Sequence, residues 1–148
     1  KAVGTEVIKY RVKLEPDDND TVLVTAPDFP GVVTFGNTRE EALDYAVGAF
    51  REMIASKIHN KEPIPEPSRI KKGEPFIVLP LQTEMKMKLY QSMLEKGVRK
   101  AELARRMKLH RQEVERLLDF HQSTSLSKIE NAFAALGKSL QIEVTESN

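Results

Sequence analysis

The amino-acid sequence predicts an α+β protein: a small ββ-β-α-β domain followed by an all-helical domain with a short C-terminal strand. Residues 8–35 alternate between apolar and polar side chains, as strands with one buried face do. Apolar residues between 39 and 60 recur near helical spacing, and helical spacing dominates again from residue 84. These patterns divide the 148 residues into domains at 1–81 and 84–148.

The first domain begins with three predicted strands. Alternation from Ile8 to Glu15 predicts the first, and turn-forming residues at 16–20 end it. Thr21–Thr25 is expected to pair antiparallel with it through that short loop. Val32–Phe35 follows as the third strand, before Gly36 and Asn37.

A long helix and a fourth strand complete this domain. Thr38 and Glu41 have the spacing of a capping box, so a helix should begin there and continue to about Asn60. The proline-rich stretch from Pro63 ends it, because proline cannot continue the helical hydrogen bonds. Phe76–Leu79 reads as the last strand.

Composition excludes several classes of protein. The chain has no cysteine, which rules out disulfide frameworks and cysteine-based zinc sites and suits the reducing cytoplasm. No apolar run approaches the roughly 20 residues that span a bilayer, so no membrane partner is expected. The three histidines, His59, His110 and His121, lack metal-ligand spacing. We therefore expect a cytoplasmic protein without a metal or cofactor.

Charge is distributed unevenly along the chain. Residues 1–68 carry 8 Lys or Arg and 12 Asp or Glu, a net charge of −4, whereas residues 84–148 carry 12 and 9, a net of +3. Within residues 96–116 there are eight basic and three acidic side chains. A basic block on an almost neutral chain indicates a polyanionic partner for that part, although a solvated helix face is the simpler alternative.

The second domain reads as four helices and a strand. The helices are expected at 85–95, 100–106, 110–120 and 126–136. Residues 139–145 alternate again and predict a terminal strand. Because this strand has no partner in its own half of the sequence, it could pair with a second copy.

The stretch Lys100–Leu118 resembles the repressor-type helix-turn-helix of phage repressors and small bacterial regulators. Ala104 is small where two helices would cross, Leu109 is apolar after the turn, and Val114 and Leu117 point inward. Lys108 stands where the family usually has glycine in a left-handed conformation, which costs about 1 kcal/mol. His110 stands at the usual position of a Ser or Thr cap. The alternative is a helical hairpin used only for dimerisation.

If this element binds DNA, its second helix enters the major groove. The residues expected to read base edges are Arg111, Gln112, Arg116 and His110. Those expected to hold phosphates are Lys100, Arg105 and Lys108. One such element covers little DNA, so a homodimer or a higher even oligomer on two half-sites is expected.

The N-terminal half resembles the HicB antitoxin family. Residues 27–42 follow its order of Pro-Asp-x-Pro-Gly, Thr-x-Gly-x-Thr and a Glu-Ala helix start, and 64–68 resemble its proline tail. Ala135-Leu136-Gly137-Lys138 resembles the helix-turn-helix subgroup of that family. The resemblance covers nearly the whole chain.

The resemblance implies a partial ribonuclease-H-like fold for the first domain. It implies a HicA-type toxin, a small basic protein that cleaves RNA, as the partner that this domain neutralises. It also implies repression of the chain's own operon by binding operator DNA. No toxin-binding residue can be carried over from the motif, but the acidic balance of residues 1–68 suits a basic partner.

Other interpretations predict different chemistry. An enzyme would need clustered carboxylates around a metal, and the candidates are Glu15, Asp17, Asp18, Asp20 and Asp28. Three of these lie in a predicted turn where acidic residues are ordinary, so we expect no catalysis. Three aromatic residues are expected in the core rather than on a stacking platform: Phe29, Phe35 and Phe50.

A stand-alone transcriptional repressor is the main alternative. Its first domain would sense a small ligand or mediate dimerisation. A short neighbouring gene for a basic protein would favour the antitoxin, and its absence would favour the sensor.

Overall fold

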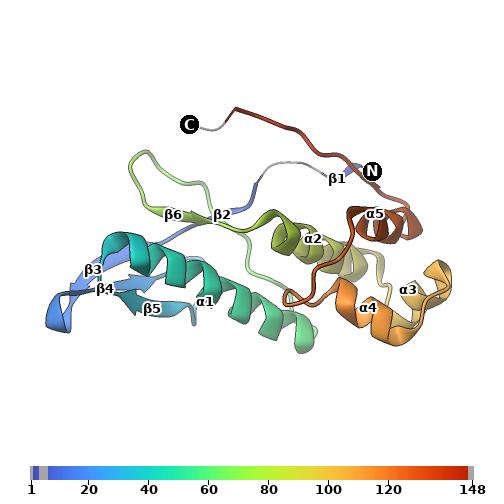
Figure 1. The fold of residues 1–148 in the computed structure, drawn as a ribbon, viewed down its shortest axis with the longest axis horizontal. Helices are drawn as coiled ribbons and strands as arrows, with labels where there is room; N and C mark the ends of the chain where they lie inside the picture. Colours follow the sequence, from blue (N-terminus) through green and yellow to red (C-terminus); the bar gives the residue numbers. More distant parts are fainter. Residues whose placement is uncertain (1, 4–6, 147–148) are drawn as a thin grey trace. The chain divides into compact units, whose positions relative to one another are not determined.

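The computed structural model describes residues 2–3 and 7–146, and these form two compact units (Figure 1). The first unit contains residues 7–80 and holds most of the strands. The second contains residues 81–146 and is mainly helical. Residues 2–3 belong to the helical unit, because their short strand pairs with the strand at its C-terminal end. The α+β class predicted from the sequence is confirmed.

The strands of the first unit form two small antiparallel sheets. The elements are β2 (Lys9–Arg11), β3 (Lys13–Asp17), β4 (Thr21–Thr25), β5 (Val33–Gly36) and β6 (Phe76–Val78). The predicted first strand is divided at Val12, because β2 pairs with β6 whereas β3 pairs with β4. Val12 is buried, and its amide donates to the Pro75 carbonyl at 3.0 Å. The chain therefore changes partner strand at this residue.

Helix α1 (Arg39–His59) packs against β4, β5 and β6 (Figure 1). Its buried residues recur every four positions: Ala42, Ala46, Phe50, Ile54 and Ile58. The Thr38 hydroxyl accepts from the Glu41 amide at 3.0 Å, as predicted. The Glu41 carboxylate accepts from Asn37 at 3.2 Å, one residue before the expected partner. A side chain at Gly36 would place its Cβ 2.5 Å from the Ala42 nitrogen, so the strand and the helix approach closely only because Gly36 has none.

The centre of the first unit is an aromatic cluster of Tyr10, Phe29 and Phe50, all fully buried. Tyr10 stacks on Phe50 with ring centroids 4.8 Å apart, and Phe29 meets both rings edge-on. The prediction that Phe35 belongs to this core is wrong, because it is 60% exposed. Phe35 lies on the edge strand β5 opposite Leu23, and alternation directs it to the other face from its neighbours Thr34 and Gly36.

The helical unit contains four helices and one short pair of strands. The elements are α2 (Leu81–Lys96), α3 (Lys100–Met107), α4 (Arg111–Leu117), α5 (Leu126–Ala135), β1 (Ala2–Val3) and β7 (Ser139–Leu140). Helix α3 packs on α4 and α5, and α2 packs on α5. Within the described residues, no helix combines the length and apolarity needed to cross a membrane.

The expected unpaired strand at 139–145 is wrong in two respects. Only Ser139–Leu140 is a strand, and it pairs in parallel with Ala2–Val3 of the same chain. Residues 141–146 are irregular. The partner lies at the opposite end of the sequence, which is why alternation near the C-terminus could not reveal it.

Candidate nucleic-acid interface

The predicted helix-turn-helix is formed by α3, a three-residue turn and α4. Four residues of its seam are buried between the helices and their neighbours: Leu103, Ala104, Val114 and Leu117. Met107 and Leu109 are half-buried. The apolar spacing in this stretch therefore serves packing, and it leaves the polar side of α4 in solvent.

Lys108 occupies the left-handed conformation that the sequence pattern predicted, with φ 56° and ψ 44°. Its amide donates to Arg105 at 3.3 Å, and the Leu109 amide donates to Ala104 at 2.9 Å. These bonds satisfy carbonyls at the end of α3, as in other left-handed helix terminations. The turn is thus closed by backbone hydrogen bonds without glycine.

His110 caps α4 through its backbone. Its amide donates to the Glu113 carboxylate at 3.2 Å, and its carbonyl accepts from the Glu113 amide at 3.0 Å. Glu113 therefore has a structural role at the start of the helix, next to residues expected to meet DNA. The imidazole of His110 remains exposed.

The side chains expected to read bases lie on the exposed side of α4. Arg111, Gln112 and Arg116 are all exposed. Gln112 and Arg116 are four residues apart and lie on the same face of the helix, and Arg111 is one residue, about 100°, away from Gln112. The structure therefore brings together three of the four predicted base-reading residues on one helix, and His110 precedes them directly.

Two of the predicted cations share one carboxylate. The Lys100 ammonium lies 2.8 Å from Glu115, and the Arg111 guanidinium lies 3.8 Å from the other oxygen of that carboxylate. Glu115 is 47% exposed at its side chain. This role of Glu115 was not predicted, although its i to i+4 spacing from Arg111 is a visible signal in the sequence.

The remaining phosphate candidates differ in their surroundings. Arg105 is paired with Glu102, and its side chain is 74% exposed. Glu102 also accepts from Arg106 at 2.8 Å, and Arg106 donates to the Ala135 carbonyl at 3.1 Å. Lys108 is exposed on the turn. Arg106 thus connects α3 to the end of α5, whereas Arg105 and Lys108 point into solvent.

The far end of α4 is held by a buried lysine that sequence analysis did not single out. Lys86 of α2 is 0% exposed. Its ammonium donates to the carbonyls of Arg116 at 2.9 Å, Asp119 at 2.7 Å and Gln122 at 2.5 Å. Burial lowers the pKa of Lys86, and the nearby charge of Asp119 opposes this effect.

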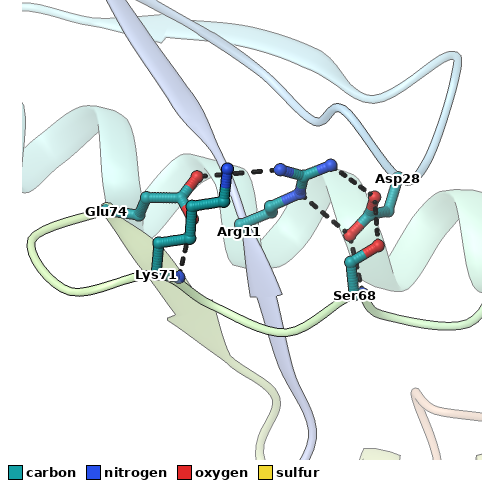
Figure 2. Close-up of polar contacts among 5 residues, drawn as sticks. All are labelled: Arg11, Asp28, Ser68, Lys71 and Glu74. Atoms are coloured by element: carbon teal, nitrogen blue, oxygen red, sulfur yellow. Dashed lines mark hydrogen bonds and ion pairs between the residues drawn. The ribbon is translucent and has the colours of Figure 1, made fainter.

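A second polar cluster lies in the first unit, around Arg11 (Figure 2). The Arg11 guanidinium donates to both oxygens of Asp28, at 3.1 and 3.2 Å. Asp28 also accepts from the amide and the hydroxyl of Ser68, both at 2.8 Å. Glu74 lies 3.7 Å from Arg11 and accepts from the Lys71 amide at 2.7 Å. The hydrogen bonds from Arg11 and Ser68 lower the pKa of Asp28.

This cluster accounts for the most buried of the proposed catalytic carboxylates. Asp28 connects β2 to the proline-rich connector and has no oxygen facing an open site. Asp17, Asp18 and Asp20 lie at the exposed β3–β4 turn. Across residues 2–3 and 7–146, no three His, Asp or Glu side chains are grouped closely enough to hold a metal ion.

Comparison with known proteins identifies the family. Residues 9–88 match the family described as "HicB_like antitoxin of bacterial toxin-antitoxin system". The chain belongs to the HicB-like antitoxin family. Antitoxin HicB 2 of Photorhabdus laumondii is 37% identical over 135 residues, which cover 91% of this chain and 95% of that protein. Antitoxin HicB of Escherichia coli K12 is 32% identical, over 91% of this chain and 98% of that protein.

Both relatives of this HicB-like chain match across its two units, which supports an antitoxin role in a toxin–antitoxin system. Among solved structures, the N-terminal domain of Burkholderia pseudomallei antitoxin HicB aligns with a TM-score of 0.42 and 20% identity. That alignment covers 50% of this chain and 98% of the solved chain. The family match and the two relatives confirm the predicted resemblance to HicB antitoxins.

Proposed function

We propose that this antitoxin represses its own operon through α4 and neutralises a HicA-type toxin through the unit at 7–80. The observation that carries the DNA-binding part is the exposed row Arg111, Gln112 and Arg116 on a helix whose opposite side is buried. The protein acts in the cytoplasm, where operator DNA is found, and serves as a regulator rather than an enzyme.

On DNA, the residues of α4 and those around it have different tasks. Arginine pairs bidentately with guanine and glutamine with adenine, so Arg111, Gln112 and Arg116 read the sequence, with His110 beside them. Lys100, Arg105 and Lys108 bind phosphates and fix the position of the helix in the groove. Two copies of the chain bind two half-sites, because one short helix covers few base pairs.

Mobility shifts with the chain's own promoter fragment test this assignment. Arg111→Ala and Gln112→Ala should each weaken the specific complex by about 1–3 kcal/mol and leave binding to a random duplex nearly unchanged. Lys100→Ala should weaken both complexes alike and reduce their salt dependence. Equal losses of Arg111→Ala on both duplexes would contradict base reading. Mass measurement of the free chain checks the expected dimer.

Charge supports the toxin-binding part of the proposal. Residues 7–80 contain 10 Lys or Arg and 12 Asp or Glu, so this unit is acidic overall and suits a basic RNA-binding partner. Co-expression with the neighbouring gene for a small basic protein is the test. The full chain and its Arg111→Ala variant should both relieve growth arrest, because Arg111 lies in the other unit. Persistent arrest with the full chain would refute neutralisation.

A further inference from the structure

The ammonium of Lys86 is fully buried and bound by backbone carbonyls, which the packing of an apolar core does not require. It is fully buried on α2 and donates to three carbonyls, all in the segment that ends α4 and continues to residue 122. An ammonium has three N–H donors, so the three carbonyls satisfy all of them. Asp119 is the acidic residue within that segment, but its carboxylate accepts from the His121 amide at 2.9 Å.

Burying a lysine without a carboxylate in direct contact is costly, because the charge loses its hydration. Uncharged residues could have filled the same space. The location of the acceptors explains the charge, since the carbonyls at a helix C-terminus carry partial negative charge. Arg116 supplies one of them, and Arg116 is also a residue expected to read DNA.

A second contact from α2 fixes the same segment. The Gln82 side chain accepts from the Thr124 amide at 2.6 Å, and the Thr124 hydroxyl lies 3.5 Å from the Arg116 carbonyl. Helix α4 has only seven residues, and its first turn is capped by Glu113. The direction of α4 therefore depends on how each of its ends is held, and Lys86 holds the C-terminal end.

We propose that Lys86 is a positioning residue for DNA recognition, and that it sets the direction of α4 so that Arg111, Gln112 and Arg116 meet base edges together. This inference rests on the proposed DNA-binding function. Without the ammonium, the end of α4 and residues 118–122 are free to shift. Base contacts then lose their geometry, while phosphate contacts, which need only nearby positive charge, are retained.

The test compares Lys86→Met with Lys138→Met in the full chain. Lys138 is a matched control: its side chain is 9% exposed in the same unit, but its ammonium donates to Ser92 at 3.0 Å and lies 3.5 Å from the Glu95 carboxylate, both on α2. Dissociation constants are measured for the promoter fragment and for a random duplex of equal length. The folded fraction of each variant is measured by circular dichroism in the same buffer.

Lys86→Met should weaken binding to the promoter fragment by about tenfold or more and change random-duplex binding by less than about twofold. Lys138→Met should leave the ratio of the two constants unchanged. If Lys86→Met does not fold, Lys86→Gln, which retains one amide donor group, should show the same loss of ratio to a smaller degree.

Three outcomes would overturn the inference. One is an unchanged ratio for a folded Lys86 variant, and another is an equal loss of ratio for Lys138→Met. The third is a loss on both duplexes in proportion to the unfolded fraction, which would leave Lys86 a purely structural role. A wild-type chain that does not prefer its promoter fragment would instead refute the proposed DNA-binding function itself.

Discussion

Arg11 in the first unit and Lys86 in the second both fasten a connecting segment, yet they do so with opposite chemistry. Arg11 is partly exposed and binds the carboxylates of Asp28 and Glu74. Lys86 is fully buried and binds only backbone carbonyls. The first cation donates to groups that carry full negative charge, whereas the second donates only to carbonyls, which carry partial charge.

This difference is reflected in the acid–base properties of the two sites. The hydrogen bond to Asp28 raises the pKa of Arg11, whereas desolvation lowers the pKa of Lys86. A partly exposed cluster of opposite charges tolerates the loss of one partner better, because water can reach it. A buried ammonium bound to carbonyls does not tolerate such a loss, because removing either the ammonium or a carbonyl leaves a buried polar group without a hydrogen-bond partner. The two sites therefore differ in how much stability one substitution removes.

The largest expected effect is that of Lys86→Met on stability. Methionine fills a similar space, but the Gln122 carbonyl loses its ammonium donor. We therefore expect the free energy of unfolding to fall by about 2 kcal/mol. Chemical denaturation followed by circular dichroism measures this loss. The matched change Arg11→Met should destabilise the chain less. A larger loss for Arg11→Met would reverse the comparison between the two sites.

The next effect is a difference between the two units in how stability depends on pH under alkaline conditions. Burial and the charge of Asp28 raise the pKa of Tyr10, so the folded chain retains the phenolic proton after the unfolded chain has lost it. Stability should therefore fall above about pH 10 by roughly 1.4 kcal/mol per pH unit. Lys86 has the opposite effect on the pH dependence of stability. Because folding lowers its pKa, the unfolded chain binds more protons between the folded and unfolded pKa values, so stability rises with pH in that range.

Absorbance at 295 nm distinguishes Tyr10 from the other two tyrosines. The expected result is a component of the absorbance change that appears only as the chain unfolds and that the Tyr10→Phe variant lacks. Tyr10→Phe should remove that late step and flatten the alkaline loss of stability. An absorbance change that is the same in the wild type and in Tyr10→Phe while both chains are still unfolding would show that the aromatic cluster is open to water.

A smaller effect is expected for Asp28→Asn. The variant keeps the shape of the side chain but removes its charge, and it replaces one acceptor oxygen with a donor group that faces Arg11 and Ser68. We expect a loss of about 1 kcal/mol. Since the pKa of Asp28 is lowered, its contribution is present above the ordinary aspartate pKa and disappears as the pH falls through the folded value. The difference from the wild type in thermal unfolding should therefore be smaller at pH 3 than at pH 7.

Asp44→Asn is the control, because Asp44 is exposed on α1. It should match the wild type at both pH values. An Asp28→Asn chain as stable as the wild type at pH 7 would mean that the cluster in Figure 2 contributes no stability.

The elements that the sequence predicted well are those whose signal is local. Helix α1 follows from the cap at Thr38 and the spacing of its buried residues, and the left-handed Lys108 follows from the spacing of the helix-turn-helix. The features that were missed depend on long-range partners. The change of partner strand at Val12 was not predicted because the second partner, β6, lies more than sixty residues away in sequence. The pairing of β7 was not predicted because its partner lies at the other end of the chain.

The same distinction explains the candidate site. Exposure of Arg111, Gln112 and Arg116 follows from the period of α4, so pattern alone predicts it. The role of Lys86 has no local signal, because its acceptors are main-chain atoms at least thirty residues away. Backbone carbonyls occur at every residue, so no residue type marks where a lysine will bind them. The prediction for Phe35 failed for a related reason. Alternation shows which residues of a strand share a face, but it does not show which face of the sheet a helix covers.

The smallest effect concerns Glu115, whose exposed ion pairs form a third kind of site beside those of Arg11 and Lys86. Its carboxylate pairs with Lys100 and Arg111, both of which are proposed to bind DNA, so the pairs must separate when Lys100 meets a phosphate and Arg111 a base. Exposed pairs contribute only about 0.2–1 kcal/mol each, and Glu115 also repels the DNA backbone directly.

Glu115→Gln should therefore leave stability nearly unchanged and tighten binding to any duplex by about two- to fivefold at low salt. Lys100 then reaches a phosphate without competition on any duplex, whereas Arg111 is released for base contacts, so the promoter fragment gains at least as much as the random duplex. Raising the salt concentration should remove the difference, because these contacts are screened within roughly 10 Å. Weaker binding of Glu115→Gln to the promoter fragment alone would show instead that Glu115 accepts a hydrogen bond from a base, as a carboxylate does from cytosine.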